Sequence, residues 1–206
     1  MMKVVKFGGS SLADAGQIQK AAAIIKAEAD RRYVVPSAPG KRFKDDIKVT
    51  DMLYQCYALA EKGEAFATQL AAIKDRYVSI LNGLSMPENL LDEEFVTISE
   101  NFRKRFGSDY AASRGEYLNG KLIAAYLGFA FVDAAEVIFF QEDGTLNRDI
   151  KFIDKAYKKA SSFEAKAALG LLHMGLKDYA PTVQMHYGLI KAIGLQKVIN
   201  HIRGTE

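Results

Sequence analysis

A lysine followed by paired glycines and paired serines lies near the N-terminus, in a pattern that could bind a phosphate chain. The segment Lys6-Phe7-Gly8-Gly9-Ser10-Ser11 follows strand-forming residues and precedes a helical pattern. Glycines at such a point let backbone N–H groups approach an anion, and a following helix adds the positive end of its dipole. Lys6 would stabilise charge as a phosphoryl group moves between oxygens. The lysine precedes the glycines, so this is not a Walker A loop, and a tight structural turn would explain the glycines alone equally well.

A second group of polar residues follows the next predicted strand. Ser37-Ala38-Pro39-Gly40 ends that strand, and Thr50-Asp51 opens the following helix. Ligands of open parallel sheets bind outside the carboxyl ends of the strands, so the hydroxyls of Ser37 and Thr50 could hold a small carboxylate. Thr50 or Asp51 could also be an ordinary helix N-cap, a role that is compatible with binding.

Glu116 is the third candidate, because its surroundings in a predicted helix are unusual. A single glutamate on a helix is normally a solvated charge. Here Gly115 and Gly120 flank it, which would let another backbone come close. A carboxylate in that setting suits the α-ammonium group of an amino acid.

These candidates need a parallel sheet to bring them together, and the N-terminal sequence predicts one. Lys3–Phe7 and Arg32–Ser37 are expected to be strands, with a helix capped by Asp14 between them. A strand–helix–strand order is the unit from which parallel sheets with helices on both faces are built, so the expected fold class is α/β.

The rest of the chain is expected to be mainly helical. Apolar and aromatic residues recur at helical spacing at Leu91, Phe95, Ile98, Phe102 and Phe106, and this aromatic stripe is assigned to core packing. Ser108 or Asp109 is expected to be a helix N-cap, and Gly128 the C′ residue of the same helix. Helices are predicted over residues 50–61, 64–81, 91–106, 108–127, 149–170 and 189–202, and further strands over 129–132 and 137–140.

Composition limits the classes of function. The 206 residues carry 28 basic and 25 acidic side chains, a net charge of +3, without a block of like charge, so no nucleic-acid partner is expected. The basic cluster Lys41, Arg42 and Lys44 lies beside Asp45 and Asp46, which indicates a solvated loop. One cysteine and three widely spaced histidines predict no disulfide and no metal site. No apolar run approaches the roughly 20 residues that span a bilayer, so we expect no membrane partner and a cytoplasmic protein.

Four separated motifs together resemble the opening half of an aspartokinase of the amino-acid-kinase fold. They are KFGGSSLADA, SAPGKR with TDMLY, SRGEYLNGKLIAAYLG and FVDAAEVI. The resemblance implies a three-layer α/β/α fold with a mainly parallel sheet and an enzyme that transfers the ATP γ-phosphoryl group to the β-carboxylate of L-aspartate, the first step towards lysine, threonine and methionine. It implies that Lys6, Gly8, Gly9 and Ser10 contact the ATP phosphates, with Lys6 catalytic, and that Ser37, Thr50 and Glu116 hold aspartate. ATP and Mg²⁺ are the implied cofactors, and a homo-oligomer is a compatible assembly.

The resemblance covers about residues 3–150. We therefore expect two domains: residues 1–150 as the N-terminal half of an amino-acid-kinase catalytic domain, and 151–206 as a helical tail with no recognised counterpart. The Arg-Gly-Gly-Ser-Asp segment expected after the fourth strand of an aspartokinase does not occur. We therefore expect a catalytic N-terminal half with weak or no activity alone. The alternative is a remnant that binds nucleotide or a partner subunit without turnover.

Overall fold

The computed structural model describes residues 3–136, which begin with two parallel strands joined through a helix. Strands β1 (Lys3–Phe7) and β2 (Arg31–Pro36) pair in parallel, with Lys6 opposite Val35. Helix α1 (Ala15–Lys26) connects them, and its Asp14 cap accepts a hydrogen bond from the backbone N–H of Gln17 at 2.9 Å. The predicted strand–helix–strand unit and its cap are confirmed.

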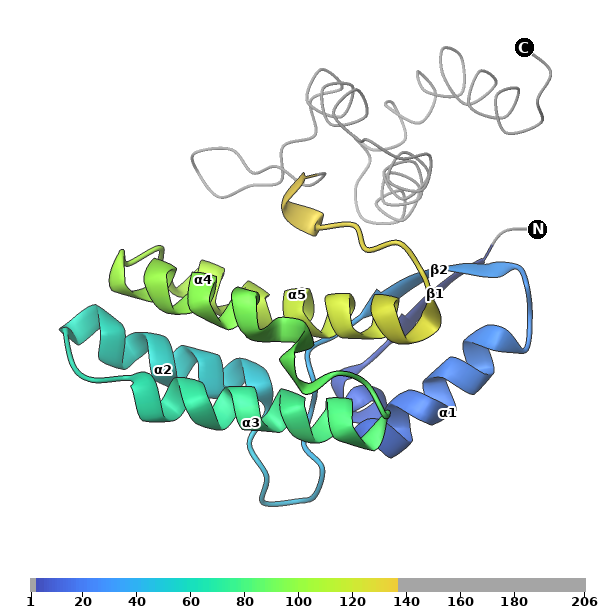
Figure 1. The fold of residues 1–206 in the computed structure, drawn as a ribbon, viewed down its shortest axis with the longest axis horizontal. Helices are drawn as coiled ribbons and strands as arrows, with labels where there is room; N and C mark the ends of the chain where they lie inside the picture. Colours follow the sequence, from blue (N-terminus) through green and yellow to red (C-terminus); the bar gives the residue numbers. More distant parts are fainter. Residues whose placement is uncertain (1–2, 137–206) are drawn as a thin grey trace, which may run out of the picture. The chain divides into compact units, whose positions relative to one another are not determined.

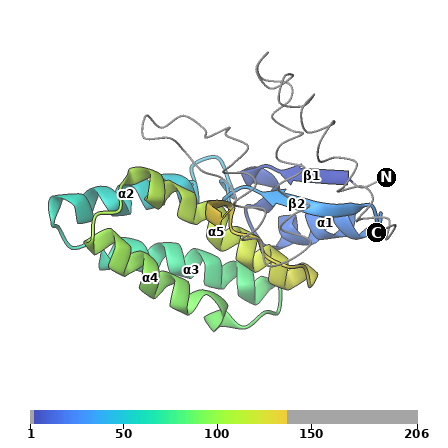
Figure 2. The same ribbon diagram turned by 90° about the horizontal axis from the view of Figure 1, so that it is seen from above.

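In the described part, four further α-helices follow and lie side by side, beside the part formed by β1, β2 and α1 (Figures 1 and 2). Their bounds are α2 Val49–Lys62, α3 Ala67–Gly83, α4 Asp92–Arg103 and α5 Ser108–Leu127, with short 3-10 helices η1 Gly9–Leu12 and η2 Glu88–Leu91. The described part is therefore α/β with a small parallel sheet and a mostly helical remainder, which agrees with the expected class. Every helix in this part is too short or too polar to cross a lipid bilayer.

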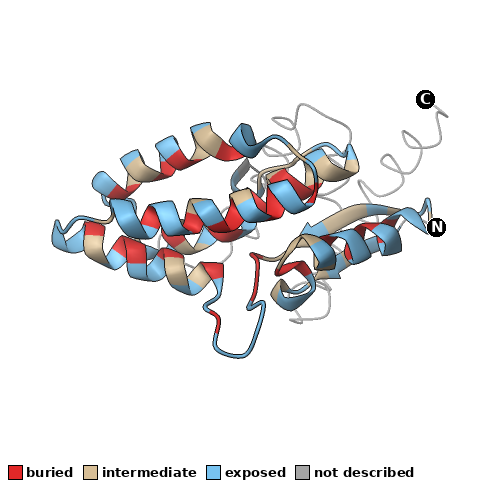
Figure 3. Cartoon of the chain, turned by 60° about the horizontal axis from the view of Figure 1, so that its bottom comes forward, coloured by how far each residue is buried: buried red, intermediate tan, exposed pale blue. Residues whose placement is uncertain are grey.

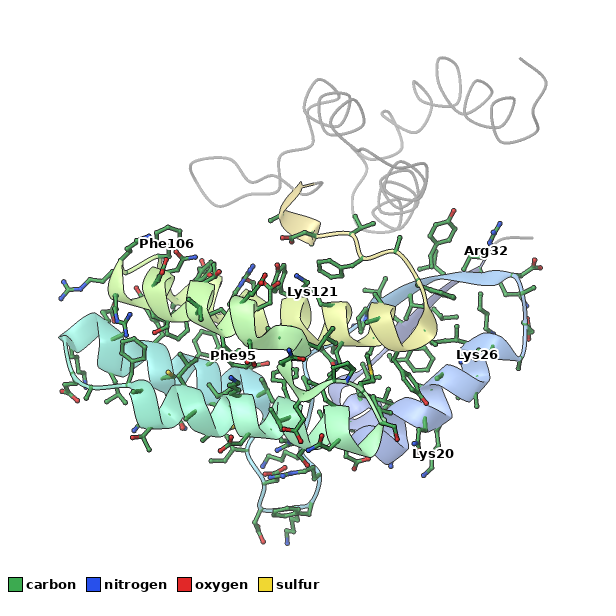
Figure 4. The ribbon with its side chains drawn as sticks, in the orientation of Figure 1. Lys20, Lys26, Arg32, Phe95, Phe106 and Lys121 are labelled. Atoms are coloured by element: carbon green, nitrogen blue, oxygen red, sulfur yellow. The ribbon has the colours of Figure 1, made fainter. Side chains whose placement is uncertain are left out.

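The buried faces of these helices form one apolar core, seen as red stripes in Figure 3. Aromatic rings meet edge-on within it: Tyr57 and Phe102 have centroids 5.4 Å apart, and Phe95, labelled in Figure 4, lies 6.1 Å from Tyr77. The assignment of the aromatic stripe to packing is confirmed through Phe102. It is wrong for Phe106, which follows the end of α4 and is 56% exposed.

Two predicted N-caps are also wrong. Helix α2 begins at Val49, because the Lys48 carbonyl accepts the first helical hydrogen bond, from Met52 N at 3.0 Å. Thr50 therefore lies in the first turn. Helix α5 begins at Ser108 after Gly107, whose φ of 98° suits glycine. The predicted C′ glycine, Gly128, is confirmed by its φ of 71°.

Residues 129–132 do not form the predicted third strand. Instead Phe131 packs edge-on against the Tyr117 ring, with centroids 5.4 Å apart, so the segment is held against α5. Within residues 3–136 the sheet has two strands. The strand predicted at 137–140 and the helices at 149–170 and 189–202 lie outside the described residues.

The chain divides into two compact units, Met1–Asp133 and Ala134–Glu206. Of the second unit the structure describes only the short 3-10 helix η3 (Ala134–Glu136). The domain boundary expected at residue 150 stays a prediction.

A buried arginine connects the helices to the loops that follow the strands. The Arg76 guanidinium of α3 donates to Asp46 Oδ2 at 2.8 Å, to the Gly40 carbonyl at 2.7 Å and to the Ala13 carbonyl at 3.2 Å. The Arg42 side chain adds two bonds to the Asp46 carboxylate, each 2.8 Å long, and its backbone N–H adds a third at 2.9 Å. Asp46 is buried, so the interpretation of this stretch as a wholly solvated loop is wrong at Asp46, although Lys41, Arg42 and Lys44 are exposed.

Replacing Arg76 with methionine should lower the free energy of unfolding by about 3 kcal/mol or more, because a buried carboxylate and two buried carbonyls lose a partner. Arg42→Met is the matched control: it removes a partner of the same carboxylate, but the Arg42 side chain is 42% exposed. There we expect a loss of about 1 kcal/mol. Urea unfolding measures both, and equal losses would contradict the central role of Arg76.

The same carboxylate should make stability depend on pH. Hydrogen bonds from Arg42 and the nearby charge of Arg76 hold the pKa of Asp46 well below its usual range. Stability from this group is thus fully present above the unfolded-state pKa of about 4 and is lost as the pH falls below it. In urea titrations between pH 6 and pH 2.5, Asp46→Asn should flatten the decline seen in the unchanged protein. Parallel curves would show that Asp46 contributes nothing to it.

Candidate functional site

The loops after β1 and β2 lie in direct backbone contact at the carboxyl ends of the two strands. Ser37 N donates to the Phe7 carbonyl at 3.0 Å, and Gly40 N donates to the Gly9 carbonyl at 2.8 Å. A Cβ added at Gly40 would lie 2.5 Å from the Gly9 carbonyl carbon. Glycine at position 40 therefore allows the two loops to meet, and the two sets of candidate residues become neighbours.

The residues expected to contact phosphates divide into an open and a packed group. Lys6, Gly8 and Ser10 are exposed, and a Cβ at Gly8 would meet no atom within 4 Å. Gly9 is packed, since a Cβ there would lie 2.8 Å from the Ala38 carbonyl oxygen. The helix expected directly after the glycines is the four-residue η1, and α1 starts only at Ala15. An anion at this edge would therefore meet Lys6 and the loop backbone rather than the N-terminus of α1.

The three residues expected to hold aspartate converge where α5 crosses the connection between β2 and α2. Ala38 N donates to Glu116 Oε1 at 3.2 Å, which links Glu116 to the residue after Ser37. A Cβ at Gly115 would lie 2.7 Å from Ala38 Cβ and 3.8 Å from Thr50 Oγ1. Glu116 is exposed and Thr50 is half-buried. The Gly115–Glu116 turn of α5 is thus adjacent to both the Ser37–Ala38 backbone and Thr50, which are far from it in the sequence.

The sequence did not predict two buried polar residues that hold Ser37 and Gly115 in position. Asn119 donates through Nδ2 to the Ser37 carbonyl at 2.6 Å, and Tyr77 donates its hydroxyl to the Gly115 carbonyl at 2.9 Å. Burial raises the pKa of Tyr77 well above its usual value, so the phenol remains a neutral donor. The signal for Asn119 was its position inside a helix, where asparagine is unfavourable unless its side chain has a specific partner. Tyr77 gave no such signal, because it lies on the apolar stripe of its helix.

The described residues do not fit a metal site made by the protein. Residues 3–136 contain no group of three His, Cys, Asp or Glu side chains that could hold a metal ion. The expectation that the protein has no metal ligands of its own stays a prediction for the whole chain.

Comparisons with known proteins find a family and relatives that match most of this chain. The model of the amino acid kinase family matches residues 1–175. Aspartokinase 3 of Bacillus subtilis is 39% identical over 142 residues, which are 66% of this chain and 31% of that protein. The chain therefore spans about a third of the length of this relative.

Solved structures extend the likeness to the fold. The crystal structure of Clostridium acetobutylicum aspartate kinase aligns with a TM-score of 0.69 and 43% identity, over 78% of this chain and 36% of that one. Escherichia coli aspartokinase III in complex with aspartate and ADP aligns with a TM-score of 0.62 over 81% of this chain and 39% of that one; at 24% identity it supports the fold alone. With a family model that matches 175 of the 206 residues, and with the strand–loop geometry described above, the chain belongs to the amino acid kinase family.

Proposed function

We propose that this chain is the N-terminal catalytic portion of an aspartate kinase, which transfers the γ-phosphoryl group of ATP to the β-carboxylate of L-aspartate. The observation that carries the proposal is the backbone contact between the two loops at the carboxyl ends of β1 and β2. It makes an exposed lysine–glycine edge the neighbour of a carboxylate–hydroxyl cluster. The likeness to proteins named aspartokinase supports the choice of substrate.

The chemistry of the proposed reaction suits the residues at this edge. The acceptor is a carboxylate that is already ionised at neutral pH, so no general base is needed. Lys6 would neutralise charge on the moving phosphoryl group, and the exposed backbone at Gly8 and Ser10 would approach the phosphates. Gly9 would contribute by closing the loop rather than by facing the nucleotide.

The acceptor would be held by groups of opposite polarity. Glu116 would pair with the α-ammonium of aspartate, and the hydroxyls of Ser37 and Thr50 would donate to its carboxylates. Positioning two reactants in this way converts a bimolecular step into an effectively unimolecular one, which is the main contribution a protein makes to such a transfer.

The remaining expectations belong to the same proposal. ATP would be the phosphoryl donor, and Mg²⁺ would accompany its phosphates and neutralise their charge. Escherichia coli aspartokinase III, which has the same fold, was solved with aspartate and ADP. A complete three-layer α/β/α domain, a cytoplasmic location and a homo-oligomer stay predictions.

Aspartate-dependent ADP release tests the proposed activity. We expect slow turnover by the unchanged chain and a loss of about 100-fold or more in Lys6→Ala, because the cation at the phosphates is removed. Lys41→Ala is the matched control, since Lys41 is another exposed lysine, and it should keep the full rate. The proposal fails if turnover does not exceed the Lys6→Ala background. Binding of nucleotide without turnover would then favour the non-catalytic alternative.

Two glycine substitutions separate phosphate contact from loop packing. Gly8→Ala should change the free energy of unfolding by less than about 0.5 kcal/mol, because its Cβ would point into open space. We expect it to weaken ATP binding about tenfold, by keeping the phosphates from the backbone.

Gly40→Ala should show the opposite result. Its Cβ would collide with the Gly9 backbone, so the protein should lose about 1–3 kcal/mol of stability. Urea unfolding and nucleotide titration measure both variants. An unchanged ATP affinity in Gly8→Ala would argue against phosphate binding at Gly8.

A further inference from the structure

Two side chains of α5, three residues apart, bind both polar groups of a single peptide unit. The Asn119 amide donates to the Ser37 carbonyl at 2.6 Å, and the Ala38 N–H donates to Glu116 Oε1 at 3.2 Å. The Ser37 carbonyl and the Ala38 N–H belong to the same peptide bond. Glu116 and Asn119 together form what we call the peptide clamp.

The clamp fixes the rotation of this peptide plane. A peptide unit is planar, so holding its carbonyl and its N–H from one helix leaves it a single orientation. Rotation by half a turn would set the Ser37 carbonyl against the Glu116 carboxylate. That contact would be repulsive, so Glu116 disfavours the flipped peptide, while the donor of Asn119 favours the observed one.

The approach of α5 makes the clamp possible. A Cβ at Gly115 would lie 2.7 Å from Ala38 Cβ, so a larger residue there would push the helix away from the loop. The hydroxyl of Tyr77, a residue of α3, donates to the Gly115 carbonyl at 2.9 Å. This hydrogen bond ties the turn of α5 at Gly115 to α3. Glu116 and Asn119 thus reach the peptide from a rigid support.

The burial of Asn119 indicates that its amide serves this contact. Asn119 has no exposed surface, and its Oδ1 atom is buried without a hydrogen-bond partner among the described residues. A buried acceptor without a partner lowers stability, a penalty that an apolar side chain of the same size would avoid. What asparagine supplies, and an apolar residue cannot, is the donor to Ser37.

We propose that Asn119 is a positioning residue for the acceptor substrate. By clamping the Ser37–Ala38 peptide with Glu116, it fixes the backbone that carries the Ser37 hydroxyl and holds one Glu116 oxygen in place. Within residues 3–136 the hydrogen bond to Glu116 goes to Oε1, which leaves Oε2 for the ammonium group of an amino acid. This inference rests on the proposed function, because it assigns Ser37 and Glu116 to aspartate.

The test compares Asn119→Asp, which keeps the shape but replaces the donor with an acceptor, with Tyr57→Phe. Tyr57 is a matched control, because its buried hydroxyl accepts from Gly107 N at 2.9 Å at the other end of α5. We expect Asn119→Asp to raise the KM for aspartate about tenfold or more, with kcat and the KM for ATP within about twofold. Tyr57→Phe should change none of these, although it removes a buried hydrogen bond as well.

Amide hydrogen exchange at Ala38 provides a readout that needs no substrate. Exchange should accelerate about tenfold in Asn119→Asp and remain unchanged in Tyr57→Phe. Equal exchange in both variants would overturn the clamp, and a parallel rise of both KM values would overturn its role for aspartate. If the unchanged chain neither binds aspartate nor turns it over, the proposed function fails, and Ala38 exchange alone then decides whether the clamp exists.

Discussion

The buried contact between Arg76 and Asp46 is the constraint on which the rest of the described structure depends. One guanidinium on α3 holds a carboxylate and the carbonyls of Ala13 and Gly40. These groups belong to the segment after β1 and to the long connection after β2, neither of which has a core of its own. A buried charge is costly unless it is paired and hydrogen-bonded, so the three partners must stay close to one another. The position of the proposed site thus depends on the buried Arg76 contacts as well as on the two-stranded sheet.

Close backbone approach is the second requirement, and glycine meets it at two different contacts. Gly40 lets the loop after β2 touch Gly9, whereas Gly115 lets α5 touch Ala38. These contacts bring the β1 edge, the β2 loop and α5 together although the residues are up to 106 positions apart (Gly9 to Gly115). Gly8 differs from both, because nothing packs against it. Within this Gly-Gly pair, therefore, Gly9 packs against the loop after β2, whereas Gly8 is open to contact with a ligand.

Local signals account for what could be predicted from the sequence. The β1–α1–β2 unit, the Asp14 cap and the Gly128 C′ position each depend on a few adjacent residues, and each was confirmed. The two misplaced N-caps and Phe106 are errors at helix ends, whereas the other failures involve distant partners. Asp46 looked solvated because Arg76 lies 30 residues away, and residues 129–132 looked like a strand because the contact of Phe131 with Tyr117 cannot be read from strand propensity. Asn119 was missed for the same reason, since its partner Ser37 is 82 residues away.

The peptide clamp gives Glu116 two roles that chemistry can separate. As a partner of Ala38 N–H it needs only an oxygen acceptor, which a glutamine amide also offers; as a partner of an ammonium group it needs a negative charge. Glutamine at position 116 would therefore preserve the peptide orientation while removing the charge, whereas aspartate at position 119 disturbs the orientation and leaves the Glu116 charge in place. Both changes act on the Glu116 carboxylate. If the ammonium group binds Glu116 only when the clamp holds that side chain, the combined effect of the two changes on aspartate binding should be less than additive. Glu116 would then bind the ammonium group through Oε2, while its Oε1 accepts the hydrogen bond from Ala38 N–H.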